Sequence, residues 1–306
     1  MPRWPTYIEQ VFVPPFRTSV PKVQRLPVVL ASPHSGSYYP PTFVSQSCQE
    51  KKVLRRSEDA FVDNIIERAP KAGLPTIKAV YPRSFVDLNR AGDELDPAMF
   101  EMPEDGNEQT FAPLTERTQA GYGMIPSVIS QGVPIYDQKL PFDEAENRIN
   151  RIYAPYHTAL SQIIDETQQQ FGCAYLLDCH SMPSWSVMSL SHAANYDRVD
   201  VVLGDRFGKT AQPEFMMFLE KFFADQGLNV VRNHPYAGGF CTEHYGQPER
   251  QQYAVQIELN RALYMDERNH TIQRLGMKRL QNVFGHLYDA LTEHFAQKIQ
   301  TQTAAE

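Results

Sequence analysis

The chain has 306 residues, of which 42% are apolar and 21% are charged, and its formal net charge is −7. The apolar fraction is enough for a sizeable core, and α/β enzymes of this length can fold as one unit. The acidic balance argues against a nucleic-acid binder, because neutralising phosphates requires clustered lysine and arginine. Affinity for an anionic substrate must therefore come from a local site.

The two ends of the chain and its cysteines bear on its location. Residues 1–25 are rich in proline and lack the apolar core of a signal peptide, so we expect an extended lead-in. Residues 298–306 form a polar tail, and no segment approaches the roughly 20 apolar residues of a membrane span. None of the four cysteines forms a CxxC pair, and Cys173 and Cys179 lie in or beside an apolar run. These features predict reduced thiols and a cytoplasmic protein; the oligomeric state is left open.

Strand-like and helix-like segments alternate along the chain, which predicts an α/β domain with a mixed or largely parallel sheet. We expect strands over 26–32, one or two within 76–90, and others at 174–181, 199–205, 228–236 and within 252–265. We expect helices over 57–73, 142–172 (with a break near Pro155), 213–227 and 267–298. Residues 91–135 show little periodicity and are predicted to form a long loop.

Two of the predicted strands run into a histidine followed by a serine. VLASPHSG (29–36) contains His34, and AYLLDCHSMP (174–183) contains His180. Ligands of α/β sheets gather at the carboxyl ends of the strands, and neutral imidazole is the commonest protein ligand of zinc. We expect the two histidines to meet in one crevice and bind a metal, although two separate core or capping histidines would also explain the pattern. There is no HExxH motif, and no GxSxG elbow supports a Ser–His hydrolase.

Carboxylates that could complete such a site occur at three places. Glu58 and Asp59 open the first predicted helix, where they could supply a third ligand or simply cap the helix. Asp178 is expected to point to the opposite side of the strand from His180 and to suit a partner of a ligand better than a ligand. Glu258, in QIELNR, could be the general base that activates water, or could pair with Arg261.

Two further segments could bind an anionic substrate. DLNR (87–90) places Asn89 and Arg90 at a predicted strand end, and Arg83 is a second candidate cation. A planar guanidinium matches a carboxylate, although a surface arginine is the alternative interpretation. The loop 233–248 contains Gly238, Gly239 and aromatics that include Tyr245, and it could supply donors to the substrate or be an ordinary turn.

Taken in order, these motifs closely resemble the N-formylglutamate amidohydrolase family over residues 27–270. The segments that carry the resemblance are PHSGSYYP, EDAFVD, RSFVDLNR, YAPYHTAL, LLDCHSMP, VVLGDRFG, NHPYAGGFCTEHYG and QIELNRALYM. The resemblance implies one domain over 1–306, a three-layer α/β/α fold like that of zinc carboxypeptidases and aspartoacylases. It also implies hydrolysis of N-formyl-L-glutamate, a small anionic N-acyl amino acid, to formate and L-glutamate, the last step of one histidine-degradation route.

The same resemblance implies roles for individual residues. His34 and His180 would bind one Zn²⁺ per chain, Asn89 and Arg90 would hold the substrate carboxylate, and Glu258 would be the base. Related enzymes have His-x-x-Glu at the first ligand, whereas position 37 here is serine, so the middle ligand falls to Asp59, with Glu58 beside it.

Two other functions remain open at the level of sequence. The same residues could serve a deacylase or peptidase acting on another N-acyl amino acid or small peptide. They could also form a non-catalytic module that binds carboxylates or metal, although such a module would have little reason to keep an acid at Glu258.

Overall fold

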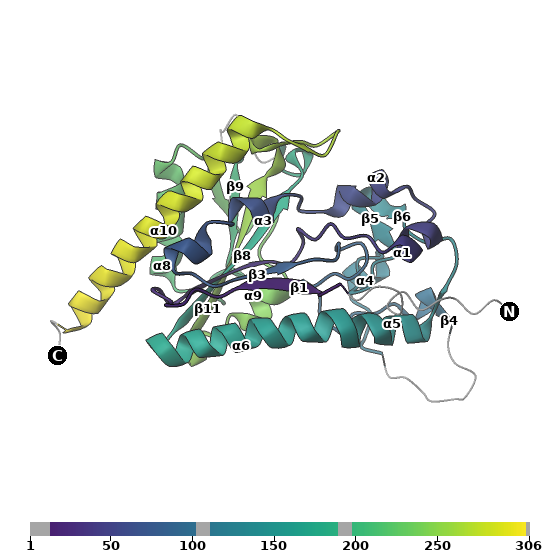
Figure 1. Cartoon of the computed structure of the whole chain (residues 1–306), viewed down its shortest axis with the longest axis horizontal. Helices are drawn as coiled ribbons and strands as arrows, with labels where there is room; N and C mark the ends of the chain where they lie inside the picture. Colours follow the sequence, from purple (N-terminus) through teal and green to yellow (C-terminus); the bar gives the residue numbers. More distant parts are fainter. Residues whose placement is uncertain (1–12, 102–110, 189–197, 304–306) are drawn as a thin grey trace. The chain divides into compact units, whose positions relative to one another are not determined.

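A seven-stranded mixed sheet organises the fold (Figure 1). The computed structural model describes residues 13–101, 111–188 and 198–303, so parts of the predicted lead-in and tail, 1–12 and 304–306, lie outside the described residues. The strand order is β1-β3-β2-β8-β11-β9-β10. These strands are β1 (Phe16–Ser19), β2 (Val28–Ser32), β3 (Thr76–Ala79), β8 (Ala174–Met182), β9 (Val201–Gly204), β10 (Val230–Arg232) and β11 (Gln252–Asn260).

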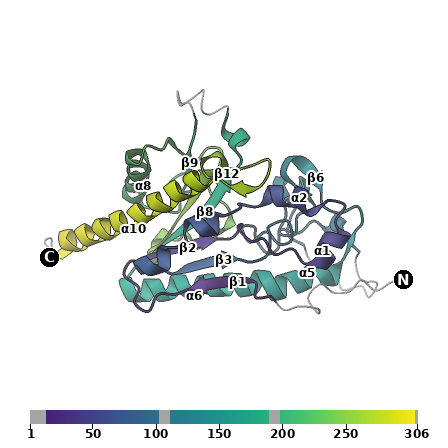
Figure 2. The same cartoon turned by 45° about the horizontal axis from the view of Figure 1, so that its top comes forward.

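The pairing within the sheet is largely parallel. Strand β8 pairs in parallel with both β2 and β11, and β9 pairs in parallel with β10. Figure 2 shows β2 beside β8. Within this sheet, the β11–β9 pair is antiparallel. A mixed, largely parallel sheet with helices is the fold class that the sequence predicts, and this prediction is confirmed.

Strands β2, β8 and β11 are buried along their whole length, as expected of parallel strands that are covered on both faces. In a strand, residues i and i+2 face the same side. Asp178 and His180 of β8 are two residues apart, as are Gln256 and Glu258 of β11, and the register pairs Gln256 with Asp178 and Glu258 with His180. One face near the carboxyl ends of these strands therefore carries all four polar side chains.

Helices and short strands complete the described structure. The helices are α1 (Pro41–Gln46), α2 (Lys51–Leu54), α3 (Val62–Ile65), α4 (Glu116–Gln119), α5 (Phe142–Arg148), α6 (Ala154–Phe171), α8 (Pro213–Asp225), α9 (Phe240–Tyr245) and α10 (Arg274–Thr303). Two-residue strands form three small ladders: β4 (Phe100–Glu101) with β7 (Leu140–Pro141), β5 (Val128–Ile129) with β6 (Val133–Pro134), and β12 (Met265–Asp266) with β13 (Thr271–Ile272). None of the helices in the described residues combines the length and apolar character needed to cross a bilayer.

By the density of internal contacts the chain forms two units. The first comprises Met1–Arg17, Pro33–Ala60 and Lys78–Leu160, and the second comprises Thr18–Ser32, Phe61–Ile77 and Ser161–Glu306. The prediction of one domain over 1–306 stays a prediction.

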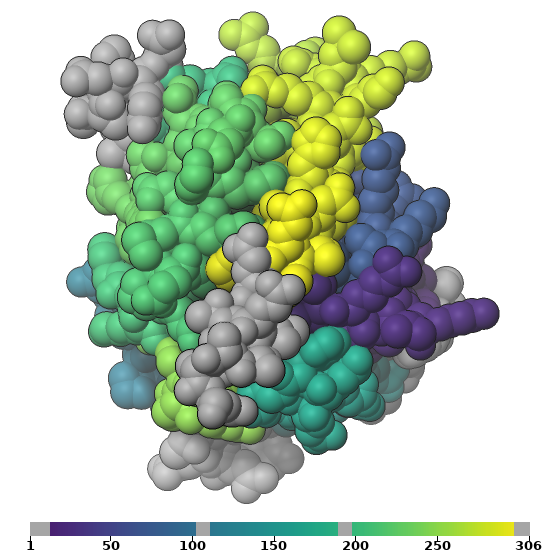
Figure 3. Space-filling model, turned by 90° about the vertical axis from the view of Figure 1, so that its left-hand side faces the viewer, coloured from purple at the N-terminus to yellow at the C-terminus, as the bar shows by residue number. Residues whose placement is uncertain are grey.

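Each unit has an aromatic core of its own. In the first unit, the rings of Phe43 and Phe85 lie 5.0 Å apart, and the guanidinium carbon of Arg148 lies 4.0 Å from the centroid of Phe85. In the second unit, Tyr175 packs on Phe215 with centroids 4.6 Å apart. Figure 3 shows α10, in yellow, lying against the green segment that contains α8.

Two of the predicted elements are much shorter than expected, and the loop expected over 91–135 contains β4, α4, β5 and β6. The helix expected over 57–73 is only the single turn α3 followed by a 3-10 turn, because Phe61 has a left-handed φ of 67° and starts a new turn. The strands expected within 76–90 reduce to β3, and the rest is turn and loop.

The break expected near Pro155 is a π-helical turn, Ile149–Tyr153, between α5 and α6. Pro155 has no amide hydrogen to donate to the carbonyl one turn earlier, and a local π turn is a common way to accommodate such a defect.

Candidate active site

Three buried acidic and imidazole side chains form a group that could hold a metal ion. His34, Asp59 and His180 each offer one ligand atom, and these atoms all lie within 4.8 Å of one another. Each of the three residues is only 2% exposed. Two imidazoles and a carboxylate are a donor set that suits a catalytic zinc, which usually has three protein ligands and one open position. The structure thus brings together the two histidines and one of the two acids that the sequence suggested.

His34 is oriented by a carboxylate on each side of its ring. Its Nε2 lies 2.6 Å from Asp87 Oδ1, and its Nδ1 lies 3.4 Å from Asp59 Oδ2. The backbone amide of Asp59 also donates to the carbonyl of His34 at 3.0 Å, which ties the two loop segments together. Because Asp87 occupies Nε2, Nδ1 is the candidate ligand atom. A carboxylate behind a ligating histidine is the usual arrangement around protein-bound zinc.

Asp87 is itself held as an anion. Arg83 Nη2 lies 2.7 Å from Oδ2, and the amide of Asn89 donates to Oδ1 at 2.9 Å. Burial alone would raise the pKa of Asp87, but the charges of Arg83 and His34 outweigh it and hold this pKa well below its usual range. Arg83, expected from the sequence to bind substrate, therefore also supports the carboxylate behind His34.

His180 has its own carboxylate neighbour on strand β8. Asp178 Oδ2 lies 2.9 Å from His180 Nε2, so the expectation that Asp178 points to the opposite side of the strand is wrong. Residues two apart on a strand share a face, and Asp178 is, as expected, placed as a partner of His180. Asp178 is fully buried, and within the described structure neither of its carboxylate oxygens makes a hydrogen bond. A buried carboxylate of this kind requires a nearby positive charge, which fits a divalent ion held by His180.

Glu58 is engaged away from the metal group. Its Oε1 accepts a hydrogen bond from Tyr39 at 2.7 Å, and Arg55 Nε lies 3.1 Å from the same oxygen. Of the two adjacent acids, Asp59 is the one in the metal group, and Glu58 anchors the turn that precedes it.

Glu258 lies beside His180 in the sheet register. The two residues are paired across β8 and β11, whose parallel pairing places their side chains on the same face. Glu258 is 7% exposed, and its Oε1 accepts a hydrogen bond from Gln256 Nε2 at 2.9 Å. Its alternative partner, Arg261, donates to the hydroxyl of Ser181 at 3.2 Å. A buried acid on the face that carries His180 suits a general base.

Asn89 and Arg90 stand in a turn and not at a strand end. Arg90 Nε donates to the carbonyl of Tyr122 at 2.9 Å, and the Tyr153 hydroxyl donates to the carbonyl of Arg90 at 2.8 Å. Burial lowers the pKa of Arg90 from its usual value, and the opposing charge of Asp87 offsets this in part. Sequence reasoning missed Tyr122 and Tyr153 as supports, although Tyr153 opens the segment YAPYHTAL.

The glycine-rich loop leads into α9. Gly238 has a φ of 121°, which favours glycine, and the amide of Gly239 donates to Gln256 Oε1 at 2.8 Å. Tyr245 ends α9 and is 5% exposed. Substrate binding by these three residues remains a prediction.

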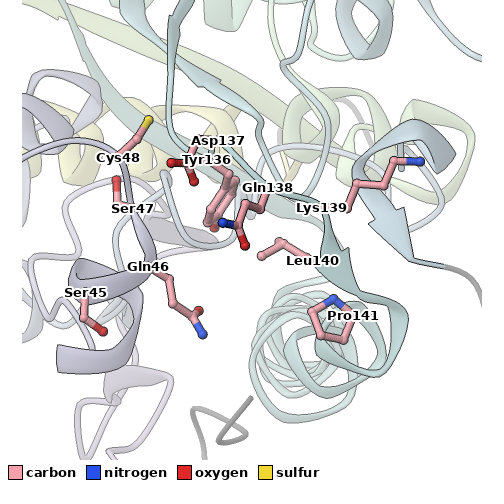
Figure 4. A pocket seen from close by; sticks show the side chains of 10 residues that line it. All are labelled: Ser45, Gln46, Ser47, Cys48, Tyr136, Asp137, Gln138, Lys139, Leu140 and Pro141. Carbon is pink, nitrogen blue, oxygen red and sulfur yellow. The ribbon is translucent and has the colours of Figure 1, made fainter. Parts of the chain in front are cut away.

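A pocket of about 250 Å³ lies elsewhere in the first unit (Figure 4). Its lining is Ser45, Gln46, Ser47, Cys48, Tyr136, Asp137, Gln138, Lys139, Leu140 and Pro141. None of the sequence-predicted site residues is among them, so the pocket does not mark the candidate active site.

Comparison with known proteins indicates the family of the chain. The family model described as N-formylglutamate amidohydrolase matches residues 26–265. An N-formylglutamate deformylase of Pseudomonas aeruginosa is 30% identical over 247 residues, which cover 79% of this chain and 84% of that protein. One from Pseudomonas putida is 28% identical over 246 residues, covering 79% and 83% of the two chains.

Solved structures with a similar fold include a member of the same family. The crystal structure of N-formylglutamate amidohydrolase from Ralstonia eutropha JMP134 has a TM-score of 0.81 and 34% identity, and the match covers 95% of this chain and 100% of that one. A gene product of Agrobacterium tumefaciens, with a TM-score of 0.63 and 15% identity over 95% and 99% of the two chains, shares the fold. The family model and the similarity to the P. aeruginosa protein together show that this chain belongs to the N-formylglutamate amidohydrolase family.

Proposed function

We propose that this protein hydrolyses N-formyl-L-glutamate to formate and L-glutamate with one zinc ion per chain. The observation that carries the proposal is the buried group of His34, Asp59 and His180, with Glu258 paired to His180 in the sheet. The family to which the chain belongs, and the deformylases it resembles, support the choice of substrate.

The chain's own residues account for the proton transfers. A zinc ion, when bound by His34, Asp59 and His180, supplies Lewis-acid polarisation of an amide carbonyl and lowers the pKa of water toward roughly 7. Glu258 accepts the proton of the water that attacks the formyl carbon. As the carbon–nitrogen bond breaks, Glu258 delivers that proton to the amide nitrogen, and formate and L-glutamate leave.

Substrate recognition falls to the turn at 87–90. The substrate carries two carboxylates, and a protein with a net charge of −7 must offset their repulsion locally. Arg90 is fixed through its Nε and its carbonyl, which leaves its orientation well defined for a carboxylate. Asn89 adds a neutral hydrogen-bond donor, and Arg83 adds a positive charge. The remaining substrate contacts would come from Gly238, Gly239 and Tyr245.

The setting of the reaction follows from the family resemblance. We place the protein in the cytoplasm, at the last step of a histidine-degradation route. The four cysteines are free thiols, which accords with a reducing compartment.

A substrate panel combined with metal analysis tests the proposal. Purified protein should contain close to one zinc per chain and release formate from N-formyl-L-glutamate faster than it cleaves N-acetyl- or N-succinyl-glutamate. Preference for another acyl group would assign the same site to a different deacylase. Stoichiometric zinc without turnover of any member of the panel would indicate a binding protein.

A further inference from the structure

Gln256 joins the glycine-rich loop to the candidate base. It is 4% exposed on strand β11, accepts from the Gly239 amide at 2.8 Å and donates to Glu258 Oε1 at 2.9 Å. A backbone amide can only donate, so Oε1 of Gln256 must face Gly239. Its Nε2 must then face Glu258, which fixes the orientation of the side-chain amide without ambiguity.

The Gly239 amide is in turn held by the loop that follows β9. Arg206 donates through its backbone amide to the Ala237 carbonyl at 2.7 Å and through Nη1 to the Gly238 carbonyl at 3.4 Å. A Cβ on Gly204 would lie 2.7 Å from the carbonyl carbon of Ala237, so β9 packs directly on this segment.

The same loop has an unusual backbone. Arg206 and Phe207 have left-handed φ values of 53° and 59°, a conformation that is strained for non-glycine residues and persists only where the surroundings hold it. The side-chain oxygen of Asn233 supplies that support by accepting from the amides of Asp205 at 3.0 Å and Phe207 at 3.3 Å. The VVLGDRFG segment, which has no role in the proposed chemistry, thus supports the backbone at Gly238 and Gly239.

We propose that Gln256 is a positioning residue for Glu258. The last torsion of a glutamate is broad and has no strong intrinsic minimum, so hydrogen bonds decide how the carboxylate is rotated. The hydrogen bond from Gln256 holds one oxygen, and the carboxylate then presents a single orientation on the face that carries His180. This inference rests on the proposed function, in which Glu258 transfers the proton.

A matched pair of variants on the same strand tests the inference. Gln252 is also buried on β11, lies on the same face, and donates to Asp165 at 2.9 Å and Gln168 at 3.3 Å. Gln256→Met should lower kcat for N-formylglutamate about 10- to 100-fold with KM within about twofold, the penalty typical of a misplaced catalytic group. Gln252→Met should leave kcat close to that of the unmodified protein, although both variants lose buried hydrogen bonds. Equal kcat values for the two variants would overturn the inference.

A third variant separates the hydrogen bond that Gln256 donates to Glu258 from the one that it accepts from Gly239. Gln256→Glu keeps an acceptor for Gly239 but loses the donor to Glu258, so its kcat should fall at least as far as that of Gln256→Met. A Gln256→Glu variant with unchanged kcat would contradict the inference. Zinc affinity, measured by competition with a chelator, should be the same in all three variants and in the unmodified protein.

Two further measurements distinguish failure of this inference from failure of the proposed function. If Glu258→Gln retains turnover, the assignment of the base is wrong. If Glu258→Gln is inactive while Gln256→Met is fully active, only the role of Gln256 is wrong. Crystal structures of the unmodified protein and Gln256→Met give a readout that needs no turnover: the Glu258 carboxylate should rotate or become disordered in the variant, and an unmoved carboxylate would refute the inference.

Discussion

The side chains of the candidate site stand on two kinds of backbone. His34, Asp59 and Asp87 lie on loops and short turns, whereas His180 and Glu258 lie within strands β8 and β11. The strand residues are placed by a ladder of backbone hydrogen bonds that does not depend on their side chains. The loop residues are placed by one another, through the contacts of His34 with Asp59 and Asp87 and of Asp87 with Arg83. A substitution of a strand residue should therefore have a local effect, whereas a substitution of a loop residue should also displace the side chains that it contacts.

Glu258→Gln should give the largest effect and the most local one. The substitution keeps the size of the side chain and removes the proposed base, so kcat should fall about 10²- to 10⁴-fold. Because β11 holds position 258 through its backbone, zinc content and thermal stability should stay close to those of the unmodified protein. Formate release and metal analysis on the same preparation check both expectations, and near-normal turnover would remove Glu258 from its assigned role.

Arg90→Ala should have the next largest effect, and this effect should fall on recognition of the substrate. Hydrogen bonds to charged groups contribute about 1.5–3 kcal/mol, so kcat/KM for N-formylglutamate should fall about 10- to 100-fold. N-formylglutamine, which lacks one of the two carboxylates, serves as the comparison substrate. A changed ratio of the two kcat/KM values would assign Arg90 to the side-chain carboxylate of the substrate. Unchanged values for both substrates would exclude Arg90 from binding.

Asp87 contacts His34 and Asp178 contacts His180. The variants Asp87→Asn and Asp178→Asn therefore compare these two carboxylates directly. Loss of the carboxylate behind a ligating histidine usually lowers metal affinity about 10- to 100-fold, and we expect this of both variants. Their metal-free forms should differ. Asp87→Asn breaks the ion pair with Arg83 and should lower the melting temperature, whereas the contact of Asp178 with His180 at 2.9 Å lacks hydrogen-bond geometry, so its neutralisation should lower the melting temperature less.

Zinc titration and thermal unfolding of metal-free protein measure these effects. If both variants lost stability equally in the absence of metal, the contrast between the loop-held and the strand-held histidine would fail.

The same contrast explains what the sequence could predict. An apolar run identified β8 and an alternating pattern identified β11, and with these strands His180 and Glu258. Correct use of the side-chain period of a strand would also have placed Asp178 beside His180 and Gln256 beside Glu258, since each pair is two residues apart. The fold class followed from the order of strands and helices.

The loop residues could not be placed in the same way. Glu58 and Asp59 are adjacent, and only the contacts of Glu58 with Tyr39 and Arg55 show which acid joins the metal group. The helix expected over 57–73 has the right apolar spacing, but the left-handed residue Phe61 interrupts it, and spacing carries no information about φ. The pairing of Arg83 with Asp87 likewise depends on a turn that replaced the expected strand.

Tyr153→Phe should give the smallest effect and tests how far the loop network extends. Tyr153 ends the π-helical turn, and its hydroxyl reaches the carbonyl of Arg90 while its ring packs on Gly92, where a Cβ would lie 2.9 Å from the ring. Removal of one neutral hydrogen bond costs about 0.5–1.5 kcal/mol, so KM for N-formylglutamate should rise about 2- to 10-fold with little change in kcat.

Tyr122→Phe is the matched control for this prediction. Arg90 binds the backbone carbonyl of Tyr122, which the substitution keeps, and the Tyr122 hydroxyl is directed to the carbonyl of Ile129 at 3.5 Å. Its KM should therefore stay near that of the unmodified protein. If Tyr153→Phe and Tyr122→Phe behaved alike, Arg90 would be fixed by its immediate turn alone, and the network that supports the loop residues would end before the π-helical turn.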